Sequence, residues 1–320
     1  LPLKIYQRAN VFRYATKATR PLIRGREFYW IEAHNCFATK KEAEAQVKED
    51  IAMTEAVMHR VFGVSFLAMK RPEWDKFPGA EYTVGSDCIL PDGKIIQQPS
   101  THMLGQHFSK AFDVKYVDEK EKEKFVYQTC YGPAISRIMA SVIATHGDDN
   151  GLVLPYTLAP VQVVIVPMYS KDSEQKIGKV ANSLNEDFFE EQIESLVDDS
   201  DKRPGEKFFH WEMKGVPFRI EIGERELDSG EVNVFIRDMK EKVLVKLENL
   251  VEEIKNLGVE YDARLIAKAG DSFNGRISDC KDKKEIKKTL DSGKIARFNF
   301  CSVGADGKKC AEFIEKDLSA

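Results

Sequence analysis

Apolar residues along the chain alternate in some segments and recur at helical spacing in others. Two strands around a turn come first. Val47, Ile51 and Met58 then lie on one face of a helical pattern and predict a helix. Thr39 followed by Glu42 has the capping-box spacing that marks where such a helix begins. The chain therefore opens as a hairpin followed by a core-facing helix.

Short alternating runs separated by turn residues dominate the next part of the chain. Pro78-Gly79 and Pro91-Asp92-Gly93 are typical turn sequences and predict breaks between strands. A second helix is predicted over 135–146 and ends at the turn residues 147–151. The charged run 118–124 is most simply a solvated loop. This part of the chain therefore predicts an antiparallel sheet with one further helix.

A new alternation of strands and helices begins after Leu154-Pro155. The pattern predicts strands over 162–167, 218–223 and 231–238, a helix over 172–184, and an acidic loop that runs to Asp201. The last helix of this part places Leu247, Leu250, Val251, Ile254 and Leu257 on one stripe. Such a stripe faces a core. The residues beyond Gly258 are highly charged.

Composition and charge narrow the class of protein. A chain of 320 residues with 42% hydrophobic and 31% charged residues is typical of a soluble protein of two or three domains. A net charge of −4 argues against a wholly basic nucleic-acid binder but allows a local basic face. No apolar run approaches a membrane span and no signal peptide is visible, so we expect a cytoplasmic protein without a membrane partner. The six cysteines indicate reduced thiols or metal ligands.

The segment Val11–His34 carries the most distinctive chemistry. It places arginines at 13, 20, 24 and 26 around a turn, and aromatic residues begin the return strand. Guanidinium groups so close together repel one another unless an anion lies among them, and their forks suit phosphate oxygens better than lysine does. The segment therefore predicts a hairpin that grips a polyphosphate. A basic surface hairpin explains the same spacing equally well.

The same segment resembles a known sequence motif. The run FRYATKATRPLIRGREFYWIEAH resembles motif 2 of class II aminoacyl-tRNA synthetases, and specifically of the prolyl-tRNA synthetases of the archaeal and eukaryotic type. The resemblance continues, in the order that family uses, through RPEWDKFPGAEYT, LGQHF, QTCYGPAISR, HGDDNGLVLP and APVQVVIVP. Several blocks in one order are far more specific than a single motif.

The resemblance implies an α+β fold in three parts. Residues 1–156 would be the C-terminal part of a class II catalytic core, which is an antiparallel sheet with flanking helices. Residues 157–258 would be an α/β anticodon-binding domain, with Glu221 and Arg225 as candidates for base readout. Residues 259–320 would be a small α/β C-terminal domain of a zinc-binding type.

The implied activity is that of a proline–tRNA ligase. ATP activates proline to prolyl-adenylate, and the prolyl group is transferred to the 3′ end of tRNA(Pro). Arg13 would hold the α-phosphate and the proline carboxylate, Arg24 would reach the terminal phosphates, and Arg137 would contact the adenine ring and the γ-phosphate. Arg13 and Arg137 are therefore the catalytic candidates. Such a step depends mostly on positioning and on charge stabilisation, which suits arginine.

The remaining nucleotide and proline contacts also follow from the resemblance. Phe28 would stack on adenine, and Gln97 and Ser100 would contact the ribose. The proline pocket would be built from Trp30, His34, Phe77 and His102, because aromatic walls suit a pyrrolidine ring. The aromatic residues can equally be core residues, and each histidine alone is more often structural. No metal ligand is predicted in the catalytic part.

The cofactors and partners are implied in the same way. ATP and Mg²⁺ would serve the reaction, proline and tRNA(Pro) would be the substrates, and the full-length protein would be a homodimer. Cys301 and Cys310 supply two of the four ligands that a structural zinc site requires, so zinc is expected only in an intact C-terminal domain. Cys36, Cys88 and Cys130 lie in core-like strands and are interpreted as packing residues.

Two departures from the family pattern keep alternatives open. Ala15 stands where motif 2 of the family has glutamate, which favours a catalytically impaired, synthetase-like paralogue that binds RNA or a protein. The chain opens with Leu1 and contains neither motif 1 nor the Thr-Ser-Glu loop, so we expect it to be an N-terminally truncated part of a longer protein. A synthetase of the same subclass for another amino acid is a third, weaker possibility. Alanine or cysteine could still enter a proline-sized pocket.

Overall fold

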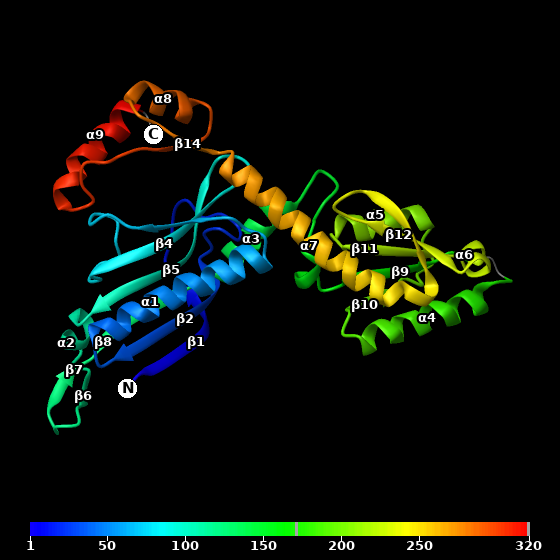
Figure 1. Cartoon of the computed structure of the whole chain (residues 1–320), viewed down its shortest axis with the longest axis horizontal. Coiled ribbons are helices and arrows are strands. Elements are labelled where there is room, and N and C mark those ends of the chain that lie inside the picture. The colour runs from blue at the N-terminus through cyan, green and yellow to red at the C-terminus, as the bar shows by residue number, and fades with distance from the viewer. Residues whose placement is uncertain (170–171, 319–320) are drawn as a thin grey trace. The chain divides into compact units, whose positions relative to one another are not determined.

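The chain folds into two compact units, each with its own sheet (Figure 1). The computed structural model describes residues 1–169 and 172–318. The first unit contains Leu1–Arg60, Val64–Ser141 and Gly270–Ala320, of which the last two residues lie outside the described part. The second unit contains Val61–Gly63 and Val142–Ala269. Both units are mixtures of helices and sheet, which confirms the predicted α+β class. The predicted domain boundaries after 156 and 258 stay predictions.

The first unit is built on an antiparallel sheet of six strands in the order β1-β2-β8-β5-β4-β3. The strands are β1 (Leu3–Phe12), β2 (Glu27–Phe37), β3 (Leu67–Lys70), β4 (Tyr82–Ile89), β5 (Ile95–Gly105) and β8 (Tyr127–Gly132). Two short strands, β6 (Lys115–Val117) and β7 (Glu123–Phe125), pair as a hairpin, so part of the charged run predicted as a loop is strand. The predicted arginine hairpin is confirmed as β1, a loop and β2.

One face of this sheet is covered by helix α1 (Lys40–Thr54), which continues as a π-helical segment, Glu55–Val61. Thr39 and Glu42 form the predicted capping box. Phe37, Ala43, Val47 and Met103 are buried together between the helix and the sheet. Side chains alternate along each strand, so the neighbours of Met103 point to the opposite face. That opposite face is therefore free to hold a site.

Two further helices follow strands of the first sheet. Helix α3 (Ile135–His146) has the bounds that the sequence predicted, because its apolar stripe ends at a cluster of turn residues. Helix α2 (His107–Ala111) is a single short turn that follows β5. Figure 1 shows α1 crossing the sheet that contains β2, β5 and β8.

The second unit has a mixed sheet of five strands in the order β10-β9-β11-β12-β13. The strands are β9 (Val163–Pro167), β10 (Ser195–Val197), β11 (Phe218–Ile222), β12 (Glu231–Ile236) and β13 (Glu241–Lys246). β9 runs parallel to both β10 and β11, and the remaining pairs are antiparallel. Every residue of β9 and β11 is buried, as expected of strands covered on both faces.

The helices of the second unit differ from the sequence prediction in three places. Helix α4 (Glu174–Glu190) ends later than residue 184 because Phe188 is also buried. The predicted acidic loop contains β10 and leads into α5 (Pro204–Met213), which was not predicted because only Lys207 and Trp211 are buried in it. Helix α7 (Leu250–Asn274) runs through residue 258, since Tyr261 and Leu265 continue its apolar stripe. The short α6 (Glu224–Ser229) follows β11.

An ion pair between the buried Arg237 and the partly exposed Asp148 joins the loop after α3 to the sheet of the second unit. The side chain of Arg237 is 0% exposed, and its guanidinium donates to both carboxylate oxygens of Asp148, at 2.9 and 2.6 Å. Its Nε donates to the carbonyl oxygen of Glu212 at 3.0 Å. The hydrogen bond from Arg237 holds the pKa of Asp148 well below its usual range. The Asp148–Arg237 pair therefore fixes the entry of the chain into this unit.

The C-terminal segment is a small α/β arrangement within the first unit. It contains two parallel strands, β14 (Ile277–Asp279) and β15 (Ile295–Arg297), and the helices α8 (Lys283–Asp291) and α9 (Lys308–Leu318). Cys280, Ile286 and Leu318 are buried together in its core. In the part of the chain that the structure describes, no helix combines the length and the apolar character needed to cross a membrane.

Candidate active site

A row of polar side chains crosses the sheet face opposite α1. The ladders place His34 on β2 opposite Cys130 on β8, Cys130 opposite His102 on β5, and His102 opposite Thr83 on β4. Residues opposite one another in neighbouring strands have side chains on the same face, about 4.5–5.5 Å apart at Cβ. The strand order thus brings four distant parts of the sequence into one line.

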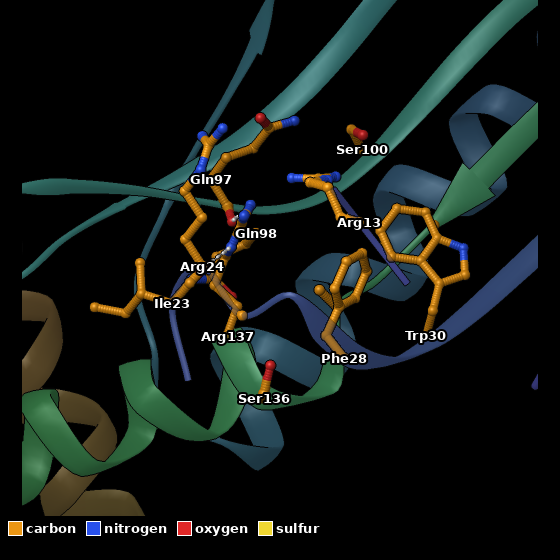
Figure 2. A pocket seen from close by; sticks show the side chains of 13 residues that line it. Arg13, Ile23, Arg24, Phe28, Trp30, Gln97, Gln98, Ser100, Ser136 and Arg137 are labelled. Atoms are coloured by element: carbon orange, nitrogen blue, oxygen red, sulfur yellow. Dashed lines mark hydrogen bonds between the residues drawn. The ribbon is translucent and has the colours of Figure 1, made fainter. Parts of the chain in front are cut away.

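A cavity of about 310 Å³ lies next to this row (Figure 2). It is lined by side chains from the arginine hairpin, from β2 and β5, and from the start of α3. The predicted site residues that line it are Arg13, Arg24, Phe28, Trp30, Gln97, Ser100 and Arg137. Three further predicted residues, His34, Phe77 and His102, do not line the cavity. Cationic and aromatic side chains in one hollow suit an anionic ligand with a planar ring.

Arg137 ties the hairpin loop to the sheet. From α3, its Nε donates to the carbonyl oxygen of Ile23 and its Nη1 donates to the carbonyl oxygen of Gln97, both at 3.2 Å. Burial, together with the nearby charges of Arg13 and Arg24, lowers the pKa of Arg137 from its ordinary value. Arginine remains charged under such conditions, so three like charges share the cavity. An anion would relieve their repulsion.

Arg13 lies against the aromatic wall of the cavity. Its guanidinium carbon is 5.3 Å from the ring centroid of Phe28, a cation–π distance. Phe28 in turn meets Trp30 edge-on, with ring centroids 5.6 Å apart. Gly132 is required beneath the indole, because a Cβ there would lie 2.6 Å from an atom of Trp30. The two rings and Arg13 therefore form one packed wall.

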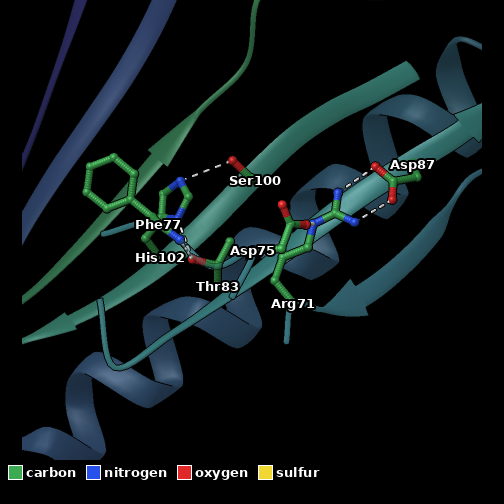
Figure 3. Close-up of polar contacts among 7 residues, drawn as sticks. All are labelled: Arg71, Asp75, Phe77, Thr83, Asp87, Ser100 and His102. Atoms are coloured by element: carbon green, nitrogen blue, oxygen red, sulfur yellow. Dashed lines mark hydrogen bonds and ion pairs between the residues drawn. The ribbon is translucent and has the colours of Figure 1, made fainter. Parts of the chain in front are cut away.

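Phe77 and His102 form a second wall beside the cavity. Their ring centroids are 4.9 Å apart, and the ring Nε2 of His102 lies 3.1 Å from Oγ of Ser100, a cavity residue (Figure 3). Burial lowers the pKa of His102 to about 4, so the imidazole is neutral at neutral pH. Although Phe77 and His102 lie outside the cavity lining, the hydrogen bond to Ser100 connects them to it.

His34 belongs to a polar cluster with Glu32 and Cys130. The Nε2 of His34 is 3.2 Å from a Glu32 oxygen, and the thiol of Cys130 donates to the other oxygen at 3.6 Å. Burial works to raise the pKa of Glu32, but the hydrogen bond and charge of His34 lower it below its usual value. The donor atoms of the three side chains all lie within 4.8 Å of one another, a spacing that could hold a metal ion. The three side chains already contact one another without an ion. The prediction that this part of the chain has no metal ligand is therefore not tested and stays a prediction.

The environment of Cys130 leads to a testable difference in thiol reactivity. Burial and the Glu32 carboxylate raise the pKa of the Cys130 thiol to about 12, so little thiolate is present near pH 8. We expect iodoacetamide to label the exposed Cys301 at least about tenfold faster, because the thiolate is the nucleophile. Peptide mass spectrometry over a time course measures both rates. Equal rates for Cys130 and Cys301 in the folded protein would contradict the assignment.

Several residues of the site were not predicted from the sequence. Ser136 and Gln98 line the cavity, and Thr83 bonds to His102, yet each is an ordinary polar residue in a strand or helix. Glu32 lies within the segment that resembles motif 2 and could have been identified by its spacing of two residues from His34. The interpretation of Cys130 as a packing residue was incomplete, because its thiol contacts Glu32.

Glu221, one of the two candidates for base readout, is paired within the protein. Glu221 is 4% exposed and binds Arg219 at 2.9 Å and Lys242 at 2.6 Å. The role of Glu221 in contacting an anticodon base stays a prediction. Its partner Arg219 lies between two aromatic rings. Arg225 lies in α6, and its role stays a prediction.

The two C-terminal cysteines lie next to each other. A hydrogen bond between Cys301 and Cys310 raises the pKa of the Cys310 thiol. In residues 1–169 and 172–318 these two thiols are not joined by further donors into a cluster of three or more, whereas a structural zinc site takes four ligands. The cysteine pair alone does not fit such a site, and zinc in the intact domain stays a prediction.

Comparison with known proteins places both units in recognised families. The tRNA synthetase class II core domain (G, H, P, S and T) matches residues 1–146, and the anticodon binding domain matches residues 162–257. Similar proteins include proline–tRNA ligases of Thermofilum pendens and Methanopyrus kandleri, each 44% identical over 99% of this chain. The chain covers 65% and 64% of these relatives, so it spans just under two thirds of their length.

A solved structure agrees with the sequence comparison. The prolyl-tRNA synthetase of Cryptosporidium parvum in complex with L-proline and AMP aligns with a TM-score of 0.93 at 34% identity. The alignment covers 100% of this chain and 68% of that protein. A second structure of the Cryptosporidium enzyme, with halofuginone and AMPPNP, aligns equally well.

Proposed function

Because the chain belongs to the prolyl-tRNA synthetase family of class II aminoacyl-tRNA synthetases, we propose that the full-length protein is a proline–tRNA ligase. It activates proline with ATP and transfers the prolyl group to the 3′ end of tRNA(Pro). The observation that carries this proposal is the cavity in which Arg13, Arg24 and Arg137 surround a space beside the rings of Phe28 and Trp30.

The first step is an in-line substitution at phosphorus. A carboxylate oxygen of proline attacks the α-phosphorus of ATP, and the bond to pyrophosphate breaks. Negative charge is spread over the phosphoryl oxygens in the transition state, so fixed cations beside them lower the barrier. Arg13 holds the α-phosphate and the proline carboxylate together, and Arg24 holds the terminal phosphates from the hairpin loop. Arg137 contacts the nucleotide while it keeps that loop on the sheet.

The nucleoside and the amino acid occupy neighbouring parts of the site. The adenine ring stacks on Phe28, and Gln97 and Ser100 contact the ribose. Proline lies toward Trp30, His34, Phe77 and His102, on the sheet face that the polar row crosses. An apolar ring gains from contact with aromatic walls, whereas a polar side chain would lose its hydration there. This chemistry favours proline over threonine or histidine as the substrate.

Magnesium fits the site only in combination with the nucleotide. The cavity lining in the described residues offers the side-chain oxygens of Gln97, Gln98, Ser100 and Ser136 but no carboxylate. Mg²⁺ prefers oxygen ligands and keeps part of its shell from phosphate and water. When bound, it would neutralise charge on the leaving pyrophosphate. Phosphate oxygens and water would supply most of the Mg²⁺ ligands, and the side-chain oxygens of the cavity would supply the remainder.

The proposal extends to the partners of the full-length protein. The match of residues 162–257 to an anticodon-binding domain supports tRNA(Pro) as the acceptor. Membership of the family supports a homodimer, which light scattering on the full-length protein would test. A cytoplasmic location, with no membrane partner, belongs to the same proposal and would be tested by cell fractionation.

Proline-dependent exchange of pyrophosphate into ATP tests the activity. We expect the full-length protein to exchange pyrophosphate with proline at a rate well above the rate without amino acid. Alanine and cysteine at the same concentration serve as matched substrates, because both are small enough to enter a proline-sized pocket. No exchange above the control without proline would overturn the proposal.

A second candidate function rests on one residue. Ala15 has an amide that donates to the carbonyl oxygen of Arg13 and a carbonyl oxygen that accepts from Arg26, but its methyl group accepts no hydrogen bond. A glutamate there could orient Arg13 or bind a substrate amine. Tight binding of tRNA without binding of ATP would select a synthetase-like RNA-binding paralogue. In that case Ala15→Glu would not restore exchange.

A further inference from the structure

A chain of hydrogen bonds runs behind the wall formed by Phe77 and His102 (Figure 3). The backbone N–H of Phe77 donates to Oγ1 of Thr83 at 3.0 Å, and the same oxygen lies 2.9 Å from Nδ1 of His102. On the other side of the ring, Nε2 lies 3.1 Å from Oγ of Ser100. Thr83 is 3% exposed and Ser100 is 9% exposed, so water has little access to the chain.

The direction of these hydrogen bonds follows from the donor at their start. Because Phe77 N–H can only donate, Thr83 Oγ1 accepts there, and its own proton needs an acceptor. In the described residues the remaining partner of that hydroxyl is Nδ1 of His102. The opposite order would give Thr83 two donors and leave its buried proton unbonded, which is unfavourable for a buried hydroxyl. Thr83 therefore donates to Nδ1, and His102 carries its proton on Nε2.

This order decides what Ser100 offers to the cavity. The Nε2–H of His102 donates to Ser100 Oγ, which occupies a lone pair of that oxygen. The hydroxyl proton of Ser100 is then free to point toward the cavity that the serine lines. A donor beside three arginines suits an oxygen of the substrate. With the other tautomer the Ser100 proton would be directed back into the ring nitrogen.

We propose that Thr83 is a positioning residue of the active site, which fixes the Nε2–H tautomer of His102 and so directs the Ser100 hydroxyl proton to the substrate. The Thr83 hydroxyl also accepts the backbone hydrogen bond of Phe77. One hydroxyl group therefore positions both Phe77 and His102. This role rests on the proposed function, because the oxygen that accepts the Ser100 proton is taken to belong to a substrate of proline activation. Thr83 itself is not part of the cavity lining.

Thr83→Val and Thr83→Ser test the proposal as a pair. Valine keeps the shape of threonine but can neither accept from Phe77 nor donate to His102, whereas serine retains the hydroxyl. In pyrophosphate exchange we expect Thr83→Val to raise the KM for ATP about tenfold, because the Ser100 hydroxyl is assigned to the ribose; this is the equivalent of one lost hydrogen bond near 1.4 kcal/mol. The KM for proline should rise less, by no more than about threefold, because valine leaves the rings of Phe77 and His102 in place and removes only the hydrogen bonds behind them.

The matched control is Thr129→Val. Thr129 is a fully buried threonine of the same sheet, and its side chain faces α1, where it accepts from Asn35 at 3.3 Å. Its replacement removes a buried hydroxyl from the opposite face of the sheet. We expect both KM values to remain within about twofold of the wild type, since no site residue loses a partner.

A direct measurement of the tautomer separates this role from simple packing. Long-range ¹H–¹⁵N correlation spectra of histidine-labelled full-length protein at pH 7 report which ring nitrogen carries the proton. His102→Gln identifies the signals. We expect an unprotonated Nδ1 in the wild type and in Thr83→Ser, and a shift toward the Nδ1–H form in Thr83→Val.

Each outcome decides between the possibilities. A wild-type His102 protonated on Nδ1, or a Thr83→Val protein with unchanged tautomer and KM, would overturn the proposal. Equal losses in Thr83→Val and Thr83→Ser would assign Thr83 to packing alone. A wild-type protein without proline-dependent exchange would refute the proposed function, whereas the tautomer in the spectra would still test the hydrogen-bond chain on its own.

Discussion

Replacing Arg13 by glutamine is expected to lower the rate of proline-dependent pyrophosphate exchange by about 100- to 1000-fold. Glutamine keeps a polar side chain that can donate one hydrogen bond, but it removes the charge and the two-pronged geometry with which we propose that Arg13 holds the α-phosphate beside the carboxylate. The loss should appear mainly in kcat, because charge on the phosphoryl oxygens grows in the transition state. Steady-state exchange at saturating proline, with ATP varied, measures it.

The matched control for Arg13 is another arginine of the same hairpin. Arg20 forms a backbone pair with Arg24, at 3.1 and 2.9 Å between nitrogen and oxygen, and does not line the cavity. Arg20→Gln is therefore expected to retain activity within about threefold. Arg13→Lys should fall between the two, since it keeps the charge but not the fork. If Arg13→Gln kept more than about a tenth of the wild-type rate, the assignment of Arg13 would be wrong.

Replacing Asp148 by alanine is expected to destabilise the second unit by about 3 kcal/mol or more. Among the described residues, the change leaves the guanidinium of Arg237, which is 0% exposed, with the carbonyl oxygen of Glu212 as its remaining hydrogen-bond partner. An unpaired buried charge is costly, because burial removes its water shell. Urea unfolding, with hydrogen-exchange mass spectrometry of β11 and β12 peptides to localise the effect, measures the change in the free energy of unfolding.

Two variants make this expectation specific to the ion pair. Asp149→Ala removes the neighbouring exposed carboxylate and should change stability by less than about 0.5 kcal/mol. The double variant Asp148→Ala/Arg237→Met should recover much of the loss, since an apolar pair in place of a buried ion pair is often neutral. An Asp148→Ala protein with the same free energy of unfolding as the wild type would show that the pair contributes nothing to stability.

The same pair makes stability depend on acid pH. The pKa of Asp148 is held below its usual range by the hydrogen bond from Arg237, so the unfolded chain binds a proton on this group more readily than the folded chain. The contribution of Asp148 is therefore complete above the unfolded pKa of about 4 and declines as the pH falls toward the lower folded pKa. The difference in urea midpoint between wild type and Asp148→Asn should narrow below pH 4. A constant difference would contradict the depressed pKa.

Much of the first unit could be predicted from the sequence because its signals are local. The alternation of β1 and β2, the capping box at Thr39 and the bounds of α3 each depend on a few neighbouring residues. The arginine hairpin could also be identified, since four guanidiniums around a turn need an explanation. The resemblance to the synthetase family added two expectations: that the anion is ATP, and that proline binds beside it.

The remaining features depend on which strands become neighbours. Thr83 reads as an ordinary strand residue until β4 pairs with β5 and places it opposite His102. Likewise, Glu32 and Cys130 meet only because β2 lies beside β8. Helix α5 was missed for another reason, since a short helix with two buried side chains has a weak periodic signal. Topology, rather than composition, therefore separates the residues that were found from those that were not.

The hydrogen bond from Arg137 to the carbonyl oxygen of Ile23 joins positions 114 residues apart. Contacts between such distant positions form late, because closing a long loop costs entropy before any contact is gained. The nucleotide cavity is therefore complete only after β8 has paired with β2 and β5. A ligand that binds only this finished state adds its binding free energy to that of folding. ATP is thus expected to stabilise only those molecules in which the six-stranded sheet is fully assembled.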